Sequence, residues 1–155
     1  MANHPEVPHA APAEPGRNGA VGPSARTRRI LIVDDDYLVA VALAGSLGES
    51  GFDVVGIASS AAEALSLARA QRPQLILMDI RLAGPQDGID AAVEIFRTLG
   101  IRCIFATAYH DPRTRARAEP ASPLGWLPKP YSMEAAVATA QAAFARLGQE
   151  ADRPA

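Results

Sequence analysis

The chain has 155 residues, a length that fits one compact domain better than two. Hydrophobic residues make up 48% and charged residues 21%, which predicts a folded core and excludes a wholly disordered chain. The net charge of −2 lacks the basic excess that drives binding to phosphate backbones, so we expect no nucleic-acid partner. No apolar run approaches the ~20 residues that cross a bilayer, and no secretory signal begins the chain. We therefore expect a cytoplasmic protein with no membrane partner.

The single cysteine, Cys103, excludes an internal disulfide and a zinc site built from cysteines. It lies in the apolar run Ile101–Ala106, where a buried structural thiol is expected.

Composition divides the chain into three segments. Residues 1–26 are rich in Pro, Gly and Ala without a sustained period, which predicts a flexible tail in which His4 and His9 are solvated. Residues 28–148 carry the predicted secondary structure and form the expected domain, and residues 149–155 are expected as a C-terminal tail.

From Arg28 onward, short aliphatic runs alternate with longer amphipathic stretches, the pattern typical of βα units around a parallel sheet. The predicted strands are Ile30–Val33, Asp53–Ala58, Gln74–Asp79, Ile101–Ala106 and Leu124–Leu127. The predicted helices are Tyr37–Ser50, Ala61–Gln71, Ile89–Leu99 and Met133–Leu147, with a short, weakly amphipathic segment at Asp111–Glu119 that Pro120 closes. Right-handed crossovers then predict a doubly wound α/β sandwich, whose site lies beyond the carboxyl ends of the strands.

Local signals mark the ends of these helices. Gly51 and Gly100 are expected to stop the first and third helices, because glycine adopts the left-handed conformation that often follows a helix. Ser59 or Ser60 is expected to cap the second helix and Ser132 the last one.

Polar side chains follow four of the five predicted strands. They are Asp34, Asp35 and Asp36 after the first strand, Asp79 at the end of the third, Thr107 after the fourth and Lys129 after the fifth. Crowded carboxylates repel one another unless a cation neutralises them, and such hard oxygen ligands suit Mg²⁺. The sequence therefore predicts a divalent-metal phosphoryl site, in which an aspartate is the nucleophile and Lys129 stabilises the transferring group.

Each of these residues also has a structural interpretation. Asp36 could simply cap the following helix, and Asp79 could be a turn residue. Thr107 could be an ordinary hydroxyl at a strand end. Lys129, the only lysine of the chain, could lie on the solvated surface. Their joint placement at four strand ends favours the functional interpretation.

Four motifs together resemble the receiver domain of bacterial two-component response regulators. They are ILIVDDD (30–36), LILMDIRLAGPQDG (75–88), IFATAY (104–109) and GWLPKPY (125–131), in the family's order and spacing over residues 28–148. The resemblance implies a flavodoxin-like sheet of order 2-1-3-4-5.

The resemblance also implies a role for each motif residue. Asp79 matches the phosphoacceptor and is also an implied metal ligand. Asp34 and Asp35 match the acidic pair that holds Mg²⁺, and the backbone carbonyl of Arg81 matches a further metal ligand. Thr107 matches the switch hydroxyl, Trp126 the aromatic switch position, and Lys129 the partner of the phosphoryl charge. The Lys129–Pro130 bond matches a peptide that is usually cis in the family.

Three positions depart from the commonest family pattern. The loop from Asp79 to Gly88 is one residue longer than usual, and Ala83 stands where proline is frequent. Residues 105–107 resemble a subgroup, found mainly in alphaproteobacteria, whose fourth strand ends Phe-Ala-Thr-Gly, but Ala108 replaces that glycine.

The expected function is that of a single-domain response regulator, a signalling switch rather than an enzyme. It would accept a phosphoryl group on Asp79 from a histidine kinase or a phosphotransfer protein, require Mg²⁺, hydrolyse the phosphate slowly and switch a surface for a downstream partner protein. The resemblance is also compatible with a weak homodimer through the fourth and fifth elements.

Two alternatives stay open. A receiver fold could bind its partner regardless of phosphorylation. A phosphatase of the haloacid dehalogenase type would use Asp34 as its nucleophile, with Thr107 and Lys129 as later motifs. That family needs another acidic pair after the lysine, where Glu134 stands alone, and it leaves Asp79 without a role.

Overall fold

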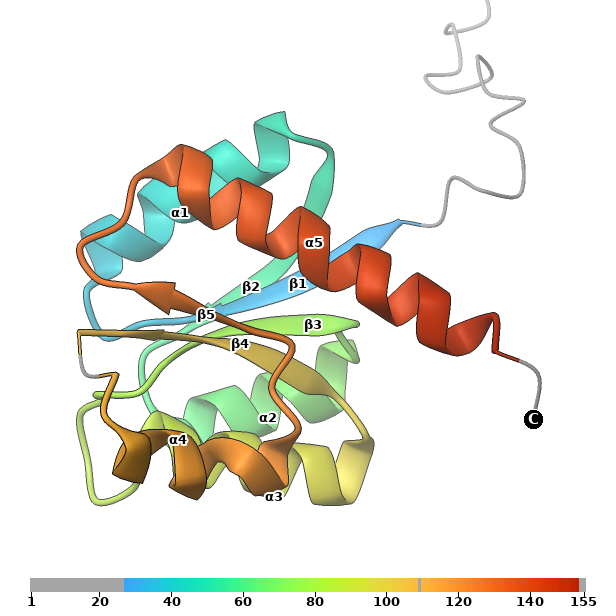
Figure 1. The fold of residues 1–155 in the computed structure, drawn as a ribbon. Helices are drawn as coiled ribbons and strands as arrows, with labels where there is room; N and C mark the ends of the chain where they lie inside the picture. Colours follow the sequence, from blue (N-terminus) through green and yellow to red (C-terminus); the bar gives the residue numbers. More distant parts are fainter. Residues whose placement is uncertain (1–26, 109, 154–155) are drawn as a thin grey trace, which may run out of the picture.

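A five-stranded sheet forms the centre of the molecule, and helices cover both of its faces (Figure 1). The structure is a computed structural model that describes residues 27–108 and 110–153. The segment predicted as an N-terminal tail, with His4 and His9, lies outside the described residues.

Every predicted strand and helix is present, with small shifts at most ends and a larger one at the end of the last helix. The strands are β1 (Arg28–Val33), β2 (Phe52–Ala58), β3 (Leu75–Asp79), β4 (Arg102–Thr107) and β5 (Gly125–Pro128). The helices are α1 (Tyr37–Glu49), α2 (Ala61–Gln71), α3 (Gly88–Leu99), α4 (Pro112–Ala118) and α5 (Met133–Ala151), with a 3₁₀ turn, η1 (Glu119–Ala121), after α4.

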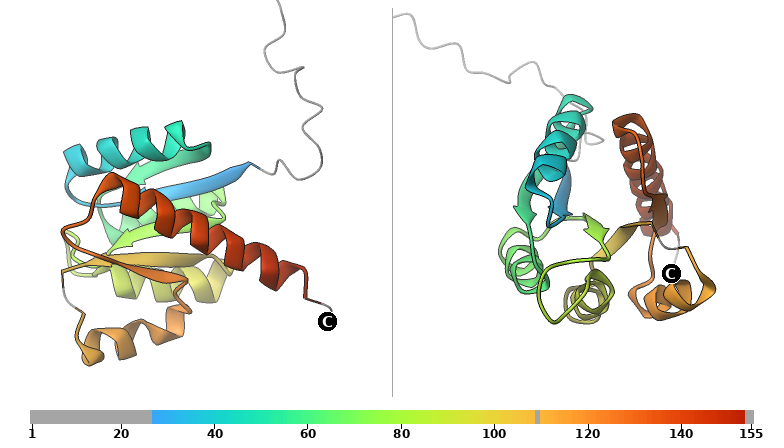
Figure 2. Two further views of the ribbon diagram at one scale, coloured as in Figure 1. Left: turned by 45° about the horizontal axis from the view of Figure 1, so that its top comes forward. Right: turned by 90° about the vertical axis from the view of Figure 1, so that its left-hand side faces the viewer.

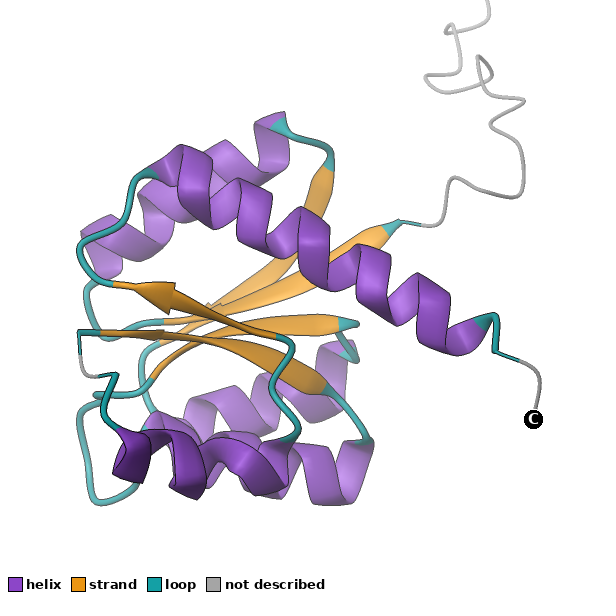
Figure 3. Ribbon diagram, viewed as in Figure 1, coloured by secondary structure: helices purple, strands orange, loops and turns teal. Residues whose placement is uncertain are grey.

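The sheet has the order β2-β1-β3-β4-β5, and each neighbouring pair is parallel, which confirms the predicted doubly wound topology. Helices α1 and α5 cover one face of the sheet, while α2, α3 and α4 cover the other (Figures 2 and 3). Because all five strands point the same way, their carboxyl ends share one edge, at the left in Figure 1.

The two faces of the sheet build two hydrophobic clusters. Strand β3 is buried at every position, and Leu77 faces the helices α1 and α5 while Ile76 faces the opposite layer. This burial on both faces explains the continuous apolar run of that strand. Cys103 is a buried free thiol, as predicted, and it belongs to the cluster between the sheet and helices α2 and α3.

Most predicted helix ends are confirmed by their caps. The Ser60 side chain accepts a hydrogen bond from Glu63 N at 3.2 Å, and Ser132 accepts one from Ala135 N at 3.0 Å. Gly100 ends α3 with a φ of 71°, a conformation that disfavours residues with a Cβ atom.

The predicted end of the last helix is wrong. Helix α5 continues past Leu147 to Ala151, into the segment predicted as a C-terminal tail. Arg146 Nη1 donates a hydrogen bond to the carbonyl of Leu124 at 2.8 Å, and the guanidinium of Arg102 pairs with the carboxylate of Glu150. The Arg102–Glu150 pair joins the added turn to β4, and Gly148 is accommodated within the helix at a cost of about 1 kcal/mol relative to alanine.

The weakest predicted helix is short, as expected. Asp111 caps α4 by accepting a hydrogen bond from Thr114 N at 2.7 Å, and Pro120 lies within η1. Arg117 ties α4 to the start of α3, because its Nη2 lies 2.9 Å from Asp87 Oδ2 and 3.5 Å from Asp90 Oδ1. Of the helices described, none combines the length and the apolar character that a membrane span requires.

Candidate functional site

The structure brings the predicted polar residues together at the carboxyl edge of the sheet. Asp79 and Thr107 are the last residues of β3 and β4, and Lys129 directly follows β5. Asp34, Asp79 and Thr107 are each at most 4% exposed, so all three polar side chains are buried. Buried polar groups need partners, which makes this edge chemically distinct from the rest of the sheet.

Three carboxylates form a compact cluster. One oxygen from each of Asp34, Asp35 and Asp79 lies within 4.8 Å of the others. Three oxygen donors at this spacing fit a hard divalent cation such as Mg²⁺, which binds through one or two carboxylates and keeps several waters. The chemistry of the donor set therefore agrees with the predicted metal site.

Asp36 has a different role from its two neighbours. Its side chain caps α1 by accepting hydrogen bonds from Leu38 N at 3.2 Å and Val39 N at 3.3 Å. The backbone N–H of Asp36 donates to Asp34 Oδ1 at 2.8 Å and so helps to orient that carboxylate. The capping interpretation is thus confirmed for Asp36.

Asp79 lies between a cation and a backbone donor. Lys129 Nζ is 3.0 Å from Asp79 Oδ2, and the N–H of Arg81 donates to Asp79 Oδ1 at 3.3 Å. The backbone N–H of Lys129 donates to the carbonyl of Thr107 at 2.9 Å, which holds the backbone of Lys129 beside the end of β4. The Lys129–Pro130 peptide is cis, as the resemblance implies. The carbonyl of Arg81 as a metal ligand stays a prediction.

The surroundings of Asp34 favour its protonated form. The pKa of Asp34 is raised from 3.8 to about 6, mainly by burial and to a smaller extent by the nearby charge of Asp79. The hydrogen bond from Asp36 N and the charge of Lys129 act in the opposite direction. At neutral pH without a cation, the Asp34 carboxylate is therefore ionised in surroundings that disfavour its charge.

We expect the substitution Asp34→Asn to stabilise the protein when no divalent metal is present. The folded pKa lies above the unfolded one, so the folded state binds the proton more tightly and the wild-type stability falls as pH rises from 3.8 through about 6. Asparagine is neutral throughout and keeps the acceptor for Asp36 N. The gain should be about 3 kcal/mol above this window and near zero below it.

Urea unfolding in the presence of a chelator measures this effect at a pH below and a pH above the window. A variant with the same unfolding free energy as the wild type at neutral pH would show that Asp34 carries no electrostatic strain.

Trp126 lies in the layer that contains α4. Its ring packs on Phe105 with 5.2 Å between ring centroids, and the guanidinium carbon of Arg115 lies 4.8 Å from the ring centroid. His110 contacts the same ring edge-on at 6.4 Å. The side chain thus links β4, β5 and α4, and it does not line the cavity beside the acidic residues.

Two further residues of the site were not found by sequence reasoning. Gly88 begins α3 directly behind Asp79, so close that a Cβ atom there would lie 1.9 Å from the Asp79 carbonyl oxygen. The pair Asp87-Gly88 at a helix start was the available signal. Tyr131 lines a cavity of about 570 Å³ together with Asp34, Asp35, Asp36 and Lys129; it ends the motif GWLPKPY, which was the available signal.

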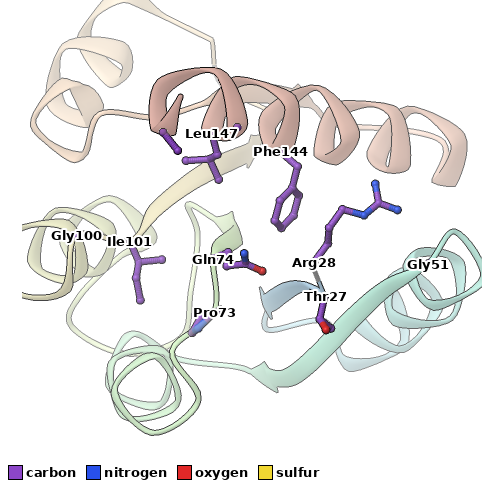
Figure 4. Close-up of a pocket in the computed structure, with 11 residues that line it drawn as sticks. Thr27, Arg28, Gly51, Pro73, Gln74, Gly100, Ile101, Phe144 and Leu147 are labelled. Carbon is purple, nitrogen blue, oxygen red and sulfur yellow. The ribbon is translucent and has the colours of Figure 1, made fainter. Parts of the chain in front are cut away.

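A second cavity has no comparable chemistry. It holds about 980 Å³ at the opposite edge of the sheet, where Phe144 and Leu147 of α5 face Ile101 and Arg28 (Figure 4). Arg28 is the one charged residue among those that line it. Its guanidinium lies 4.1 Å from the ring centroid of Phe52 and donates to the carbonyl of Ser50 at 3.1 Å. These contacts give Arg28 a structural role.

Comparison with known proteins supports the same family. Residues 30–141 match the model of the response regulator receiver domain. The transcriptional regulatory protein PdtaR of Mycobacterium tuberculosis is 34% identical over 119 residues, which cover 77% of this chain and 58% of that protein. The phyllosphere-induced regulator PhyR of Methylorubrum extorquens is 39% identical over 94 residues, covering 59% of this chain and 35% of PhyR. The chain therefore spans less than two thirds of these relatives.

Solved structures agree with the sequence relatives. The signal receiver domain of a modulated diguanylate cyclase from Desulfovibrio desulfuricans superposes with a TM-score of 0.72 at 31% identity, covering 81% of this chain and 99% of that one. The response regulator PhyR from Brucella abortus gives a TM-score of 0.65 at 30% identity, covering 81% of this chain and 51% of PhyR. The phosphatase interpretation gains no support. With its matched family model, its acidic cluster, its Lys129–Asp79 ion pair and its sheet order, this chain belongs to the response regulator receiver domain family.

Proposed function

We propose that this chain is a phosphoryl-accepting switch in which Asp79 takes a phosphoryl group from a histidine kinase or a phosphotransfer protein. The observation that carries the proposal is the placement of Asp79. It is a buried carboxylate that shares a cluster with two other acids and lies 3.0 Å from the single lysine of the chain. A structural ion pair would not need the two additional carboxylates.

The chemical step assigns one task to each residue. An oxygen of Asp79 attacks phosphorus, the P–N bond of the donor phosphohistidine breaks, and an acyl phosphate forms. Lys129 pairs with the charge of the phosphoryl oxygens in place of the carboxylate it holds now, and the Thr107 hydroxyl donates to one of them. Asp34 and Asp35, with the Arg81 carbonyl, would hold Mg²⁺, which supplies charge neutralisation for the transferring group.

An apolar rim beside the acidic site supports a protein as phosphoryl donor. Leu38 is 80% exposed and Val41 45% exposed, both on α1 close to the cap Asp36. Exposed apolar side chains grouped at the mouth of a polar site are typical of protein-binding surfaces. A kinase or phosphotransfer domain could bury them while it presents its histidine.

The switching surface is proposed to include α4, β5 and α5. When the phosphoryl group draws Thr107 inward, the space beside β4 opens to the ring of Trp126, which now contacts Arg115 of α4. Movement of that ring would loosen α4, which is also held to α3 by the ion pairs of Arg117 with Asp87 and Asp90. Phosphorylation acts on this surface only through its different affinity for the two arrangements.

Calorimetric titration with beryllofluoride, a mimic of the aspartyl phosphate, tests the proposal. In the presence of Mg²⁺ we expect saturable binding together with a change in the fluorescence of Trp126, the only tryptophan. With a chelator both signals should disappear, because three uncompensated carboxylates repel the anionic ligand.

The two readouts separate the alternatives. Binding without a fluorescence change, together with unaltered partner affinity, would favour a receiver fold that binds its partner regardless of phosphorylation. Absence of binding under all conditions would contradict the proposed phosphoryl acceptor.

A further inference from the structure

Helix α4 has little apolar surface with which to bind the rest of the molecule. Ala118 is the one buried residue among the residues of this helix, all of which the structure describes. Two of its arginines make contacts with neighbouring elements. Arg117 pairs with the two acids at the start of α3, and the guanidinium of Arg115 lies over the ring of Trp126 in β5. The position of α4 therefore depends on two charged contacts, one with α3 and one with β5.

The ring of Trp126 is held between the sheet and α4. Trp126 pairs with Phe105 across β4 and β5, and the centroids of the two rings are 5.2 Å apart. From α4, the guanidinium carbon of Arg115 lies 4.8 Å from the centroid of the Trp126 ring. A guanidinium at this distance is attracted by the negative face of an indole ring. Arg115 thus favours the position of the ring beside α4.

The strands β4 and β5 connect this ring to the acidic site. Thr107 follows Phe105 by two residues in β4, so the two side chains lie on the same face of the sheet. In the same arrangement Lys129 Nζ lies 3.0 Å from the carboxylate of Asp79. Lys129 leaves this carboxylate for the phosphoryl oxygens in the proposed transfer. The contact between Arg115 and Trp126 therefore belongs to the arrangement that precedes the transfer.

We propose that Arg115 is a positioning residue that holds Trp126 beside α4 and so opposes the switching of the acidic site. Movement of the ring toward Thr107 breaks its contact with Arg115, and the free energy of that contact adds to the cost of switching. Removal of the contact raises the population of the switched arrangement. A ligand that binds this arrangement gains apparent affinity in proportion to its population. The inference rests on the proposed function, because it concerns the regulation of the same site.

Three substitutions in α4 test this role. Arg115→Met keeps an unbranched, flexible side chain but removes the charge over the ring. Arg115→Lys keeps a cation at the same position. Arg113→Met is the matched control, because Arg113 is exposed on the same helix and side chains two residues apart do not share a helix face. It removes the same charge from α4 and leaves the contact between Arg115 and Trp126 intact.

Calorimetric titration with beryllofluoride in saturating Mg²⁺ gives the Kd of each protein. We expect Arg115→Met to bind beryllofluoride about 2- to 5-fold more tightly than the wild type, the factor that corresponds to a cation–π contact of an exposed arginine. Arg115→Lys should lie between these two proteins. Arg113→Met should bind no more tightly than the wild type, because the loss of a positive charge does not favour an anion.

The fluorescence of Trp126, the only tryptophan, gives a second measurement. Before beryllofluoride is added, the emission spectrum of Arg115→Met should differ from that of the wild type, because the ring has lost its cation. At saturating beryllofluoride the two spectra should coincide, because the ring has then moved away from residue 115 in both proteins.

Equal beryllofluoride affinity of Arg115→Met and Arg113→Met would overturn the role of Arg115 while the phosphoryl acceptor itself stands. Weaker binding by Arg115→Met than by Arg113→Met would also overturn it, because the contact would then stabilise the switched arrangement. Spectra of Arg115→Met and the wild type that differ equally with and without beryllofluoride would show that the ring stays beside residue 115, against this inference. A wild type that fails to bind beryllofluoride in Mg²⁺ would overturn the proposed function together with this inference.

Discussion

Replacing Asp79 with asparagine should abolish the incorporation of phosphate into this chain. The amide has nearly the same shape as the carboxylate but is not a nucleophile toward phosphorus. The substitution also removes one of the three clustered oxygens and the charged partner of Lys129, 3.0 Å away. Labelling by a small phosphodonor such as acetyl phosphate, followed by mass spectrometry of the intact protein, measures the loss. We expect the rate of incorporation to fall by about 1,000-fold or more, to below detection.

Asp36→Asn is the matched control for this experiment. Asp36 is close in sequence to the cluster but caps α1 through Leu38 N and Val39 N, and asparagine caps a helix equally well. This variant should be labelled at nearly the wild-type rate. Label that persists in Asp79→Asn and disappears in Asp34→Asn would identify Asp34 as the nucleophile and revive the phosphatase interpretation.

Gly88→Ala should destabilise the protein by about 3 kcal/mol or more, a large effect for the addition of one methyl group. The added Cβ atom would lie 1.9 Å from the carbonyl oxygen of Asp79 and 2.9 Å from the Cα atom of Ile80. Both atoms belong to the backbone, so no side chain can rotate away. Either the first turn of α3 or the end of β3 has to move, and Gly88 N would lose its 2.7 Å hydrogen bond to the carbonyl of Ile80.

The same displacement should impair the acidic site, because Asp79 is the residue that is pushed. In those Gly88→Ala molecules that fold, we therefore expect slower phosphate incorporation as well as a lower urea midpoint. Gly45→Ala is the matched control. Gly45 lies within α1 with nothing within 4 Å of its added Cβ, so alanine should raise the unfolding free energy by about 0.5–1 kcal/mol. Similar changes in the two variants would contradict the steric explanation.

Sequence periodicity was sufficient to predict the elements and most of their ends. The run from Leu75 to Asp79 is apolar because β3 is buried on both faces, and Ser132 and Gly100 mark helix ends through bonds with residues close in the chain. The sheet order came from the family resemblance, since periodicity does not specify which strands pair. The strand ends also located the site, because parallel strands bring Asp34, Asp79 and Lys129 to one edge whatever their separation in sequence.

Contacts between distant residues, by contrast, were decided by the tertiary structure. Near the end of α5, Glu150 contacts Arg102, a residue 48 positions away in the sequence. The close approach of Gly88 to Asp79 and the shared cavity that Tyr131 and Asp34 line depend on how whole elements pack. Local sequence patterns indicate whether a residue is buried and where its own helix or strand begins and ends. They do not indicate which atoms of distant segments come into contact in the folded chain, and those contacts set the environment of the acidic site.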